Sequence, residues 1–246
     1  MALILNHFFS EVLTECNSMS LIIPVEVCKK ERYPVLWLLP PAGYDHTAWQ
    51  RRTGIEQLAE KYGIMIVMPD MKLSYGLNMA YGFSYFKMLT EELPKMVQEY
   101  FPADMNRQII GGVEEGAYAA MMSALRFPEN YKVAIALSGG SLTNEKVEEK
   151  HKKQVENAFG TSDLSMLSHS EADLAYWIGR QECSMQKVYV AYSEKDRYGH
   201  SANLLVHDLQ PVFNKWLNVE TSDEPLAWSG WEKLLDKYLG KEWEQA

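Results

Sequence analysis

The chain has 246 residues, of which 47% are hydrophobic and 23% are charged, and its formal net charge at pH 7 is -9. This balance excludes wholesale disorder, and no apolar run reaches the roughly 18 residues that a membrane-spanning helix needs. A negative chain without clusters of lysine and arginine lacks the basic footprint that nucleic acids and anionic lipids require, so we expect neither nucleic acid nor membrane as a partner.

The amino terminus and the cysteines favour a cytoplasmic protein. Residues 1–10 are apolar but lack the basic region and the small-residue cleavage site of a signal peptide. Cys16, Cys28 and Cys183 are an odd number without CxxC or Cys/His spacing, which indicates neither a disulfide framework nor a zinc site. We expect no metal and no other cofactor. No repeat or flexible linker divides residues 1–246, so we expect one domain.

Buried strands alternate with amphipathic helices along the chain. The apolar runs predict strands over residues 22–27, 33–39, 64–68, 108–111, 132–137 and 187–192. Thr47 is the expected N-cap of a helix that carries Trp49, Ile55 and Leu58 and ends at Gly63. Helical spacing then predicts a helix with an apolar face over residues 83–100, bent at Pro94, and further helices over residues 116–126, 202–217 and 231–239.

This alternation predicts an α/β fold with a mostly parallel sheet and helices on both faces. Residues 141–185 are more polar and only partly helical, which indicates a cap or insertion over the sheet. A ligand crevice is expected at the carboxyl ends of the strands, so the loops that matter follow Leu39, Met68, Gly111, Leu137 and Tyr192.

Five short blocks of sequence in these regions follow a pattern that is typical of one protein family. They are Tyr-Pro-Val-Leu-Trp-Leu-Leu ending at residue 39, Ala48-Trp49, Ile-Val-Met-Pro at 66–69, Ala-Tyr-Gly-Phe-Ser-Tyr-Phe at 80–86 and Thr-Glu-Glu-Leu-Pro at 90–94. Together they resemble the esterase D and tributyrin esterase branch of the α/β-hydrolases, the broad "putative esterase" family that includes S-formylglutathione hydrolases. The resemblance is dense from Tyr33 to Gly140 and looser from Lys187 to Leu239. It implies an α/β-hydrolase fold.

The resemblance also implies a catalytic apparatus: a serine in a G-x-S-x-G elbow, a histidine that accepts its proton and an aspartate that orients the histidine. In this chain the elbow reads Gly-Val-Glu-Glu-Gly at 112–116, which places Glu114 where the serine is expected. The expected His-x-Trp near the C-terminus reads Ser229-Gly230-Trp231, and Asp196 matches the acid. Because the flanking glycines are kept, we expect a tight turn with Glu114 at positive φ.

The oxyanion hole implied by the resemblance is also changed. Pro40 and Pro41 replace a His-Gly pair and remove two backbone donors, whereas Ala42 keeps the N–H aimed at the oxyanion, and Glu115 occupies the other oxyanion-hole position. Carboxylates at Glu114 and Glu115 would oppose the developing negative charge. Since loss of triad members typically costs about 10⁴ to 10⁶ in rate, we expect no serine esterase activity and a binding or regulatory role.

Two alternatives stay open at this point. The chain could be an active carboxylesterase with rewired machinery, in which Glu114 is the nucleophile and His46 or His200 activates water. The other interpretation of these two histidines is a solvated or packing side chain. The second alternative is a structural role, with the fold kept for the interface of a homo-oligomer.

The altered site suggests a class of small-molecule ligand. Besides Pro40 and Pro41, we expect Tyr75, Tyr81 and Trp228 to line the pocket, and aromatic faces with carboxylates favour ammonium or guanidinium groups. The competing expectation is that backbone donors, Arg51, Arg52 or Lys72 neutralise Glu114. Trp49 and Tyr118 are expected in the core, Ser138 in an ordinary turn rather than as an alternative nucleophile, and the mixed charges over residues 145–153 on a solvated helix face.

Overall fold

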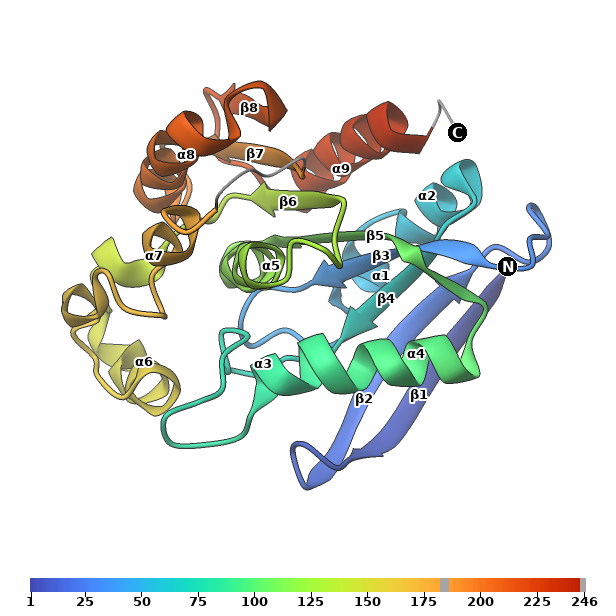
Figure 1. Ribbon diagram of the computed structural model, residues 1–246, viewed down its shortest axis with the longest axis horizontal. Helices are drawn as coiled ribbons and strands as arrows, with labels where there is room; N and C mark the ends of the chain where they lie inside the picture. The colour runs from blue at the N-terminus through green and yellow to red at the C-terminus, as the bar shows by residue number, and fades with distance from the viewer. Residues whose placement is uncertain (182–185, 244–246) are drawn as a thin grey trace.

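A computed structural model describes residues 1–181 and 186–243, which form an eight-stranded sheet with helices on both faces (Figure 1). The strand order is β1-β2-β4-β3-β5-β6-β7-β8. β1 pairs antiparallel with β2, and β2 pairs antiparallel with β4. All the remaining neighbours in this order, from β4 through β3 and on to β8, pair in parallel. The strands are β1 (Ala2–Ser10), β2 (Glu15–Ile23), β3 (Tyr33–Leu39), β4 (Met65–Pro69), β5 (Ala103–Val113), β6 (Val133–Leu137), β7 (Lys187–Ser193) and β8 (Leu217–Ser222).

The helices cover the two faces unequally. One face packs against α1 (Ala48–Arg52), α2 (Ile55–Tyr62) and α9 (Trp228–Trp243), through a core that includes Trp49, Ile55 and Leu235. The other face carries α3 (Tyr85–Lys87), a π-helical turn over Met88–Glu92, α4 (Leu93–Tyr100), α5 (Glu115–Arg126) and α8 (Gly199–Phe213). The expected α/β-hydrolase architecture is therefore confirmed.

The central strands are buried along their whole length. Every residue of β3, β4 and β6 is buried, as expected for parallel strands that have helices on both faces. The bounds of β3 are those predicted from the apolar run, and Gly63, in the left-handed conformation with φ 59°, ends α2 as predicted.

One predicted strand needs correction, and two strands were not predicted. The strand predicted at 22–27 is wrong for most of its length, because β2 ends at Ile23 and Pro24 opens a turn. The sequence interpretation also missed β1, whose outward residues include the exposed Leu5 and Phe9, and β8, an edge strand that alternates between half-buried and exposed residues. Both lie at the edges of the sheet.

The helix predictions were too long in two places. The helix expected beyond Thr47 is divided into α1 and α2. Thr47 is the N-cap residue of α1, as predicted, but its hydroxyl donates to Asp45 and forms no capping hydrogen bond with α1. The helix expected over 202–217 ends at Phe213, and β8 begins at Leu217. In the helical stretch near Pro94 the π-helical turn lies just before the proline, which has no backbone N–H to donate.

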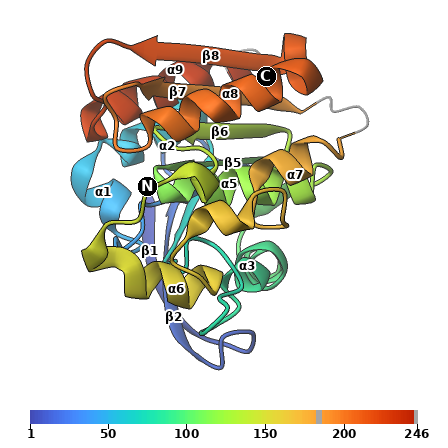
Figure 2. The same cartoon turned by 90° about the vertical axis from the view of Figure 1, so that its left-hand side faces the viewer.

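Residues 142–181 contain only short helices: α6 (Lys152–Phe159), α7 (Leu174–Ile178) and 3₁₀ turns over Leu142–Asn144, Glu149–His151 and Leu164–Leu167. Figures 1 and 2 place this segment beside α5, on the side of the sheet toward which β3 and β6 point. It leads from β6 to β7, so it adjoins the expected ligand crevice. The end of the predicted cap, together with Cys183, lies outside the described residues. In the described part of the chain, no helix is both long and apolar enough to cross a membrane.

Candidate functional site

Glu114 lies in the tight turn that joins β5 to α5. Its φ and ψ are 52° and -118°, a conformation that is costly for a residue with a Cβ, and the prediction of a positive φ is confirmed. The two glycines allow the turn to close, since a Cβ on Gly112 would collide with the backbone of Gly116 and one on Gly116 with the carbonyl oxygen of Pro40. The turn therefore presents Glu114 at the carboxyl end of the sheet.

Glu115, the first residue of α5, is buried, and its carboxylate accepts bonds from three groups. The Ala42 backbone N–H donates to Oε2 at 3.1 Å, and the Tyr198 hydroxyl donates to Oε1 at 2.6 Å. Arg197 Nη1 forms an ion pair with Oε1 at 3.2 Å. The Glu115 carboxylate therefore occupies the Ala42 N–H, the donor that the family resemblance assigns to the oxyanion hole.

The Glu114 side chain, in contrast, forms no hydrogen bond or ion pair with the described residues. Burial, and after it the charge of the neighbouring Glu115, raise the pKa of Glu114 to about 7, whereas Arg197 opposes the shift. Burial and Glu115 also raise the pKa of Tyr75 to about 12 and the pKa of Tyr198 well above its usual range. The region is an acidic cluster in which Arg197 is the nearby cation.

Asp196, the expected acid, has its carboxylate occupied by local donors. Oδ2 accepts bonds from Ser138 Oγ at 2.6 Å and from the Ser193 N–H at 2.8 Å, and Oδ1 accepts one from the Leu226 N–H at 2.7 Å. Trp231 Nε1 donates to Ser138 Oγ at 2.8 Å. The Ser138 hydroxyl therefore connects the Asp196 carboxylate to Trp231 of α9 through two hydrogen bonds.

Ser229, expected at the position of the general base, is exposed in the first turn of α9. Its side chain forms no hydrogen bond with Asp196 or Glu114 within the described chain. Glu114 lies close enough to Glu115 and Asp196 to interact with their charges, whereas Ser229 is hydrogen-bonded to none of these three carboxylates in the described chain.

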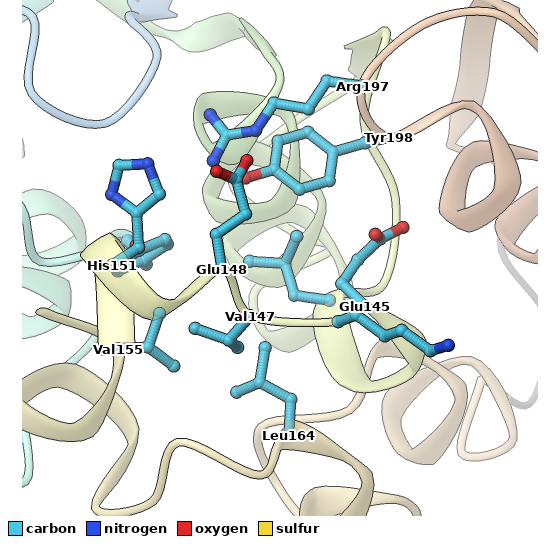
Figure 3. A pocket seen from close by; sticks show the side chains of 11 residues that line it. Glu145, Val147, Glu148, His151, Val155, Leu164, Arg197 and Tyr198 are labelled. Atoms are coloured by element: carbon cyan, nitrogen blue, oxygen red, sulfur yellow. The ribbon is translucent and has the colours of Figure 1, made fainter. Parts of the chain in front are cut away.

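A cavity of about 130 Å³ opens beside this cluster, between Tyr75, Arg197, Tyr198 and the segment that follows β6 (Figure 3). Val147, Val155 and Leu164 form apolar walls, and Figure 3 shows the Glu148 carboxylate directed toward Arg197 and Tyr198. Sequence reasoning missed both Arg197 and Tyr198. Their position directly after Asp196, in the loop that follows β7, was the available signal.

The other expected wall residues do not line this cavity. Tyr81 is 66% exposed and borders a separate open hollow with Tyr44, and Trp228 packs edge-on against Trp49 and Trp231. Pro40 lines only a small gap next to Glu115, and the adjoining Pro41 is buried. Of the three aromatic residues proposed as walls, Tyr75 alone borders the cavity.

The counter-charges expected from sequence are engaged elsewhere. Arg51 pairs with Asp45 and Lys72 pairs with Asp70, and among the described contacts neither Arg51, Arg52 nor Lys72 reaches Glu114. Trp49 and Tyr118 are buried in the core, as predicted. The mixed charges over residues 145–153 form exposed ion pairs such as Glu148–Lys150 and Glu149–Lys152, but on 3₁₀ turns and the start of α6 rather than along one helix face.

A family model described as "Putative esterase" matches residues 10–188. The chain belongs to this esterase family. An acetyl esterase of Caldicellulosiruptor saccharolyticus is 24% identical over 96% of both chains, and an S-formylglutathione hydrolase of Paracoccus denitrificans is 30% identical over 44% of this chain and 46% of the relative.

Solved structures of similar fold include a fluorophosphonate-binding serine hydrolase of Staphylococcus aureus, with a TM-score of 0.84 and 21% identity over 98% of this chain and 97% of the other. An S-formylglutathione hydrolase of Staphylococcus aureus gives a TM-score of 0.82 at 20% identity, covering 98% of both chains. At this level of identity the structures establish the shared fold.

A catalytic role for the carboxylates of this esterase-family chain would need a histidine beside them as a base. His46 Nδ1 lies 2.7 Å from Ser20 Oγ, and burial lowers the pKa of His46. His200 is exposed at the start of α8. Within the described residues, no histidine nitrogen is hydrogen-bonded to Glu114 or Asp196, so the geometry supplies neither carboxylate with a basic partner.

Proposed function

We propose that this member of the esterase family is a binding protein without serine esterase activity. The observation that carries the proposal is the Glu115 carboxylate on the Ala42 N–H at 3.1 Å. A substrate carbonyl that used this donor would have to displace a buried carboxylate that Tyr198 and Arg197 also hold. Any oxyanion formed there would meet a negative charge instead of a set of free donors.

The elbow supports the same conclusion. Glu114 has the backbone conformation of a strained strand-to-helix turn, but its side chain supplies a carboxyl group in place of a hydroxyl. Asp196 bonds to Ser138 and to backbone N–H groups, so it has no imidazole to orient. With nucleophile and base both replaced, a rate loss of about 10⁴ to 10⁶ is the expected consequence.

The ligand class that we propose for this site is a small cation. Glu114 has no partner among the described residues, and it lies near the negative charges of Glu115 and Asp196, with Arg197 as the opposing charge. An ammonium or guanidinium group would give the Glu114 carboxylate a charge-assisted hydrogen bond, and its binding would favour the ionised form. A primary amine is therefore the first probe to use.

Two measurements test this proposal together. Purified protein should hydrolyse p-nitrophenyl acetate no faster than a control protein, and primary amines should raise the melting temperature of the wild type but not of Glu114→Gln. Saturating amine at a hundredfold excess over its dissociation constant should stabilise the protein by about 2.7 kcal/mol. Glu99→Gln, at an exposed position on α4, is the matched control and should keep the amine response.

The alternative, a rewired hydrolase in which Glu114 is the nucleophile, is favoured by one observation, the position of Glu114 in the strained turn between β5 and α5. Ester hydrolysis that Glu114→Gln abolishes and Glu99→Gln preserves would favour this alternative. Hydrolysis at the control rate, with an amine response that depends on Glu114, would favour the binding protein.

A further inference from the structure

A second cavity lies away from Glu114, where the ends of α5 and α6 meet the loop before α3. Its volume is about 290 Å³, close to the lower limit of about 300 Å³ for small-molecule sites. Backbone hydrogen bonds from Ala80 to Ala158 and from Tyr81 to Asn157 join the loop to α6. Both walls are thus held in place by secondary structure and backbone pairing, so the cavity is formed without a ligand.

Arg126, in the last turn of α5, is the charged group on one wall. Its guanidinium is stacked between Phe86 and Trp177, 4.6 Å and 4.7 Å from the ring centroids. In residues 1–181 and 186–243, no carboxylate forms an ion pair with it and no acceptor takes a hydrogen bond from it. Stacking fixes the plane of this half-buried group but leaves its N–H donors free for an anion.

Glu171 lies on the same cavity and carries the opposite charge. Its carboxylate is exposed and forms no ion pair with any described residue, Arg126 included, although the two side chains border one space. Leu77, Phe86 and Phe159 supply apolar surface between them. The cavity therefore offers a donor array for an anion, an acceptor for a cation and an apolar wall.

We propose that this cavity binds a free α-amino acid with an apolar side chain. Arg126 would donate two parallel N–H bonds to the α-carboxylate, the geometry that a guanidinium favours, and Glu171 would pair with the α-ammonium group. The apolar side chain would lie against Leu77, Phe86 and Phe159. A small zwitterion meets both charges in a space of this size, whereas a monocarboxylate leaves Glu171 unpaired and an amine leaves Arg126 unpaired.

The site is distinct from the one around Glu114. The two cavities share no lining residue, and the ring of Phe159 contacts the ring of Tyr75, which lines the other cavity, at a centroid distance of 5.3 Å. Because no residue lines both cavities, the proposal for this cavity does not depend on whether the chain hydrolyses esters or binds amines at Glu114.

Isothermal titration with L-phenylalanine, phenylacetate and phenethylamine tests the proposal on the full chain carrying Glu114→Gln, which removes the amine site proposed above, so that each ligand reports on this cavity alone. L-Phenylalanine should bind at one site and at least tenfold more tightly than either single-charge analogue. Arg126→Gln and Glu171→Gln should each weaken L-phenylalanine at least tenfold. Arg180→Gln is the matched control, because Arg180 stacks on Tyr176 outside the cavity, and it should leave the affinity unchanged.

Glu171→Gln keeps the test decisive if Arg126→Gln disturbs the packing of α5 on α7, since Glu171 is exposed. No saturable binding of L-phenylalanine at millimolar concentrations would overturn the proposal. Equal affinity for phenylacetate, with no effect of Glu171→Gln, would also overturn it, because the cavity would then select a carboxylate alone.

Discussion

Replacement of Glu114 by glutamine should change the pH dependence of stability in a defined direction. The carboxyl group has a pKa of about 7 in the folded protein against a reference value of 4.5, so the folded state binds its proton more tightly than the unfolded state does. For an acid with a raised pKa, the wild type is most stable, relative to the glutamine variant, below pH 4.5. That advantage is lost as the pH rises from 4.5 to 7.

The size of the effect follows from the same two pKa values. At about 1.4 kcal/mol per pKa unit, the difference between 4.5 and about 7 corresponds to about 3 kcal/mol of unfolding free energy. Glutamine carries no titrating proton and avoids the cost of ionising a half-buried, unpaired group. The free energy of unfolding of Glu114→Gln, relative to wild type, should therefore rise by about 3 kcal/mol between pH 4.5 and pH 7.5.

Urea denaturation followed by tryptophan fluorescence, at closely spaced pH values, measures this difference. Glu99→Gln, at an exposed site on α4, should follow the wild-type curve at every pH. A constant difference between wild type and Glu114→Gln across this range would refute the reasoning, because the carboxyl group would then be as well solvated in the folded state as in the unfolded one.

Three further predictions concern the same region. Glu115→Gln should lower the unfolding free energy by about 2 kcal/mol, because the Tyr198 hydroxyl and the Ala42 N–H lose a charged acceptor. The ion pair with the half-exposed Arg197 contributes little to this loss. Calorimetry should show a melting temperature about 4 to 8 °C lower than that of the wild type. Ser138→Ala should lower the unfolding free energy, measured by urea denaturation, by about 1 to 3 kcal/mol, since Asp196 loses a donor and the Trp231 N–H loses its acceptor. The control Ser222→Ala removes only a local turn bond and should lower it by less than about 0.5 kcal/mol. Glu114→Ser should gain no more than trace hydrolysis of p-nitrophenyl acetate, because a new hydroxyl there has no histidine beside it and Glu115 still occupies the Ala42 N–H; hydrolysis well above the wild-type rate would show that the oxyanion hole is open.

The sequence predicted most of the sheet because burial on both faces leaves a strong signal. The run at 33–39 is apolar throughout and became β3 with the predicted bounds. β8 was missed because an edge strand alternates between half-buried and exposed residues and does not stand out from a helix end. The apolar helix face predicted over residues 83–100 ends at Phe83 and Tyr100, which are 43% and 69% exposed, because Phe83 precedes the start of α3 and Tyr100 is the last residue of α4.

The site was predictable in its backbone but not in its side-chain contacts. The pair of glycines flanking Glu114 indicated the tight turn, because only residues without a Cβ fit there, and the positive φ followed from that. The pairing of Glu115 with Arg197 was not predictable, because the two residues are 82 positions apart and meet only when β5 and β7 enter the same sheet. Local sequence cannot say which of several basic residues will neutralise a buried carboxylate.

The most direct test of the proposed loss of esterase activity is intact-mass spectrometry after incubation with a fluorophosphonate probe. The wild-type chain should show no adduct, because Glu114 stands in the tight turn in place of a nucleophilic serine and Glu115 blocks the Ala42 N–H. A stoichiometric adduct that maps to one serine, accompanied by loss of ester hydrolysis, would contradict the account.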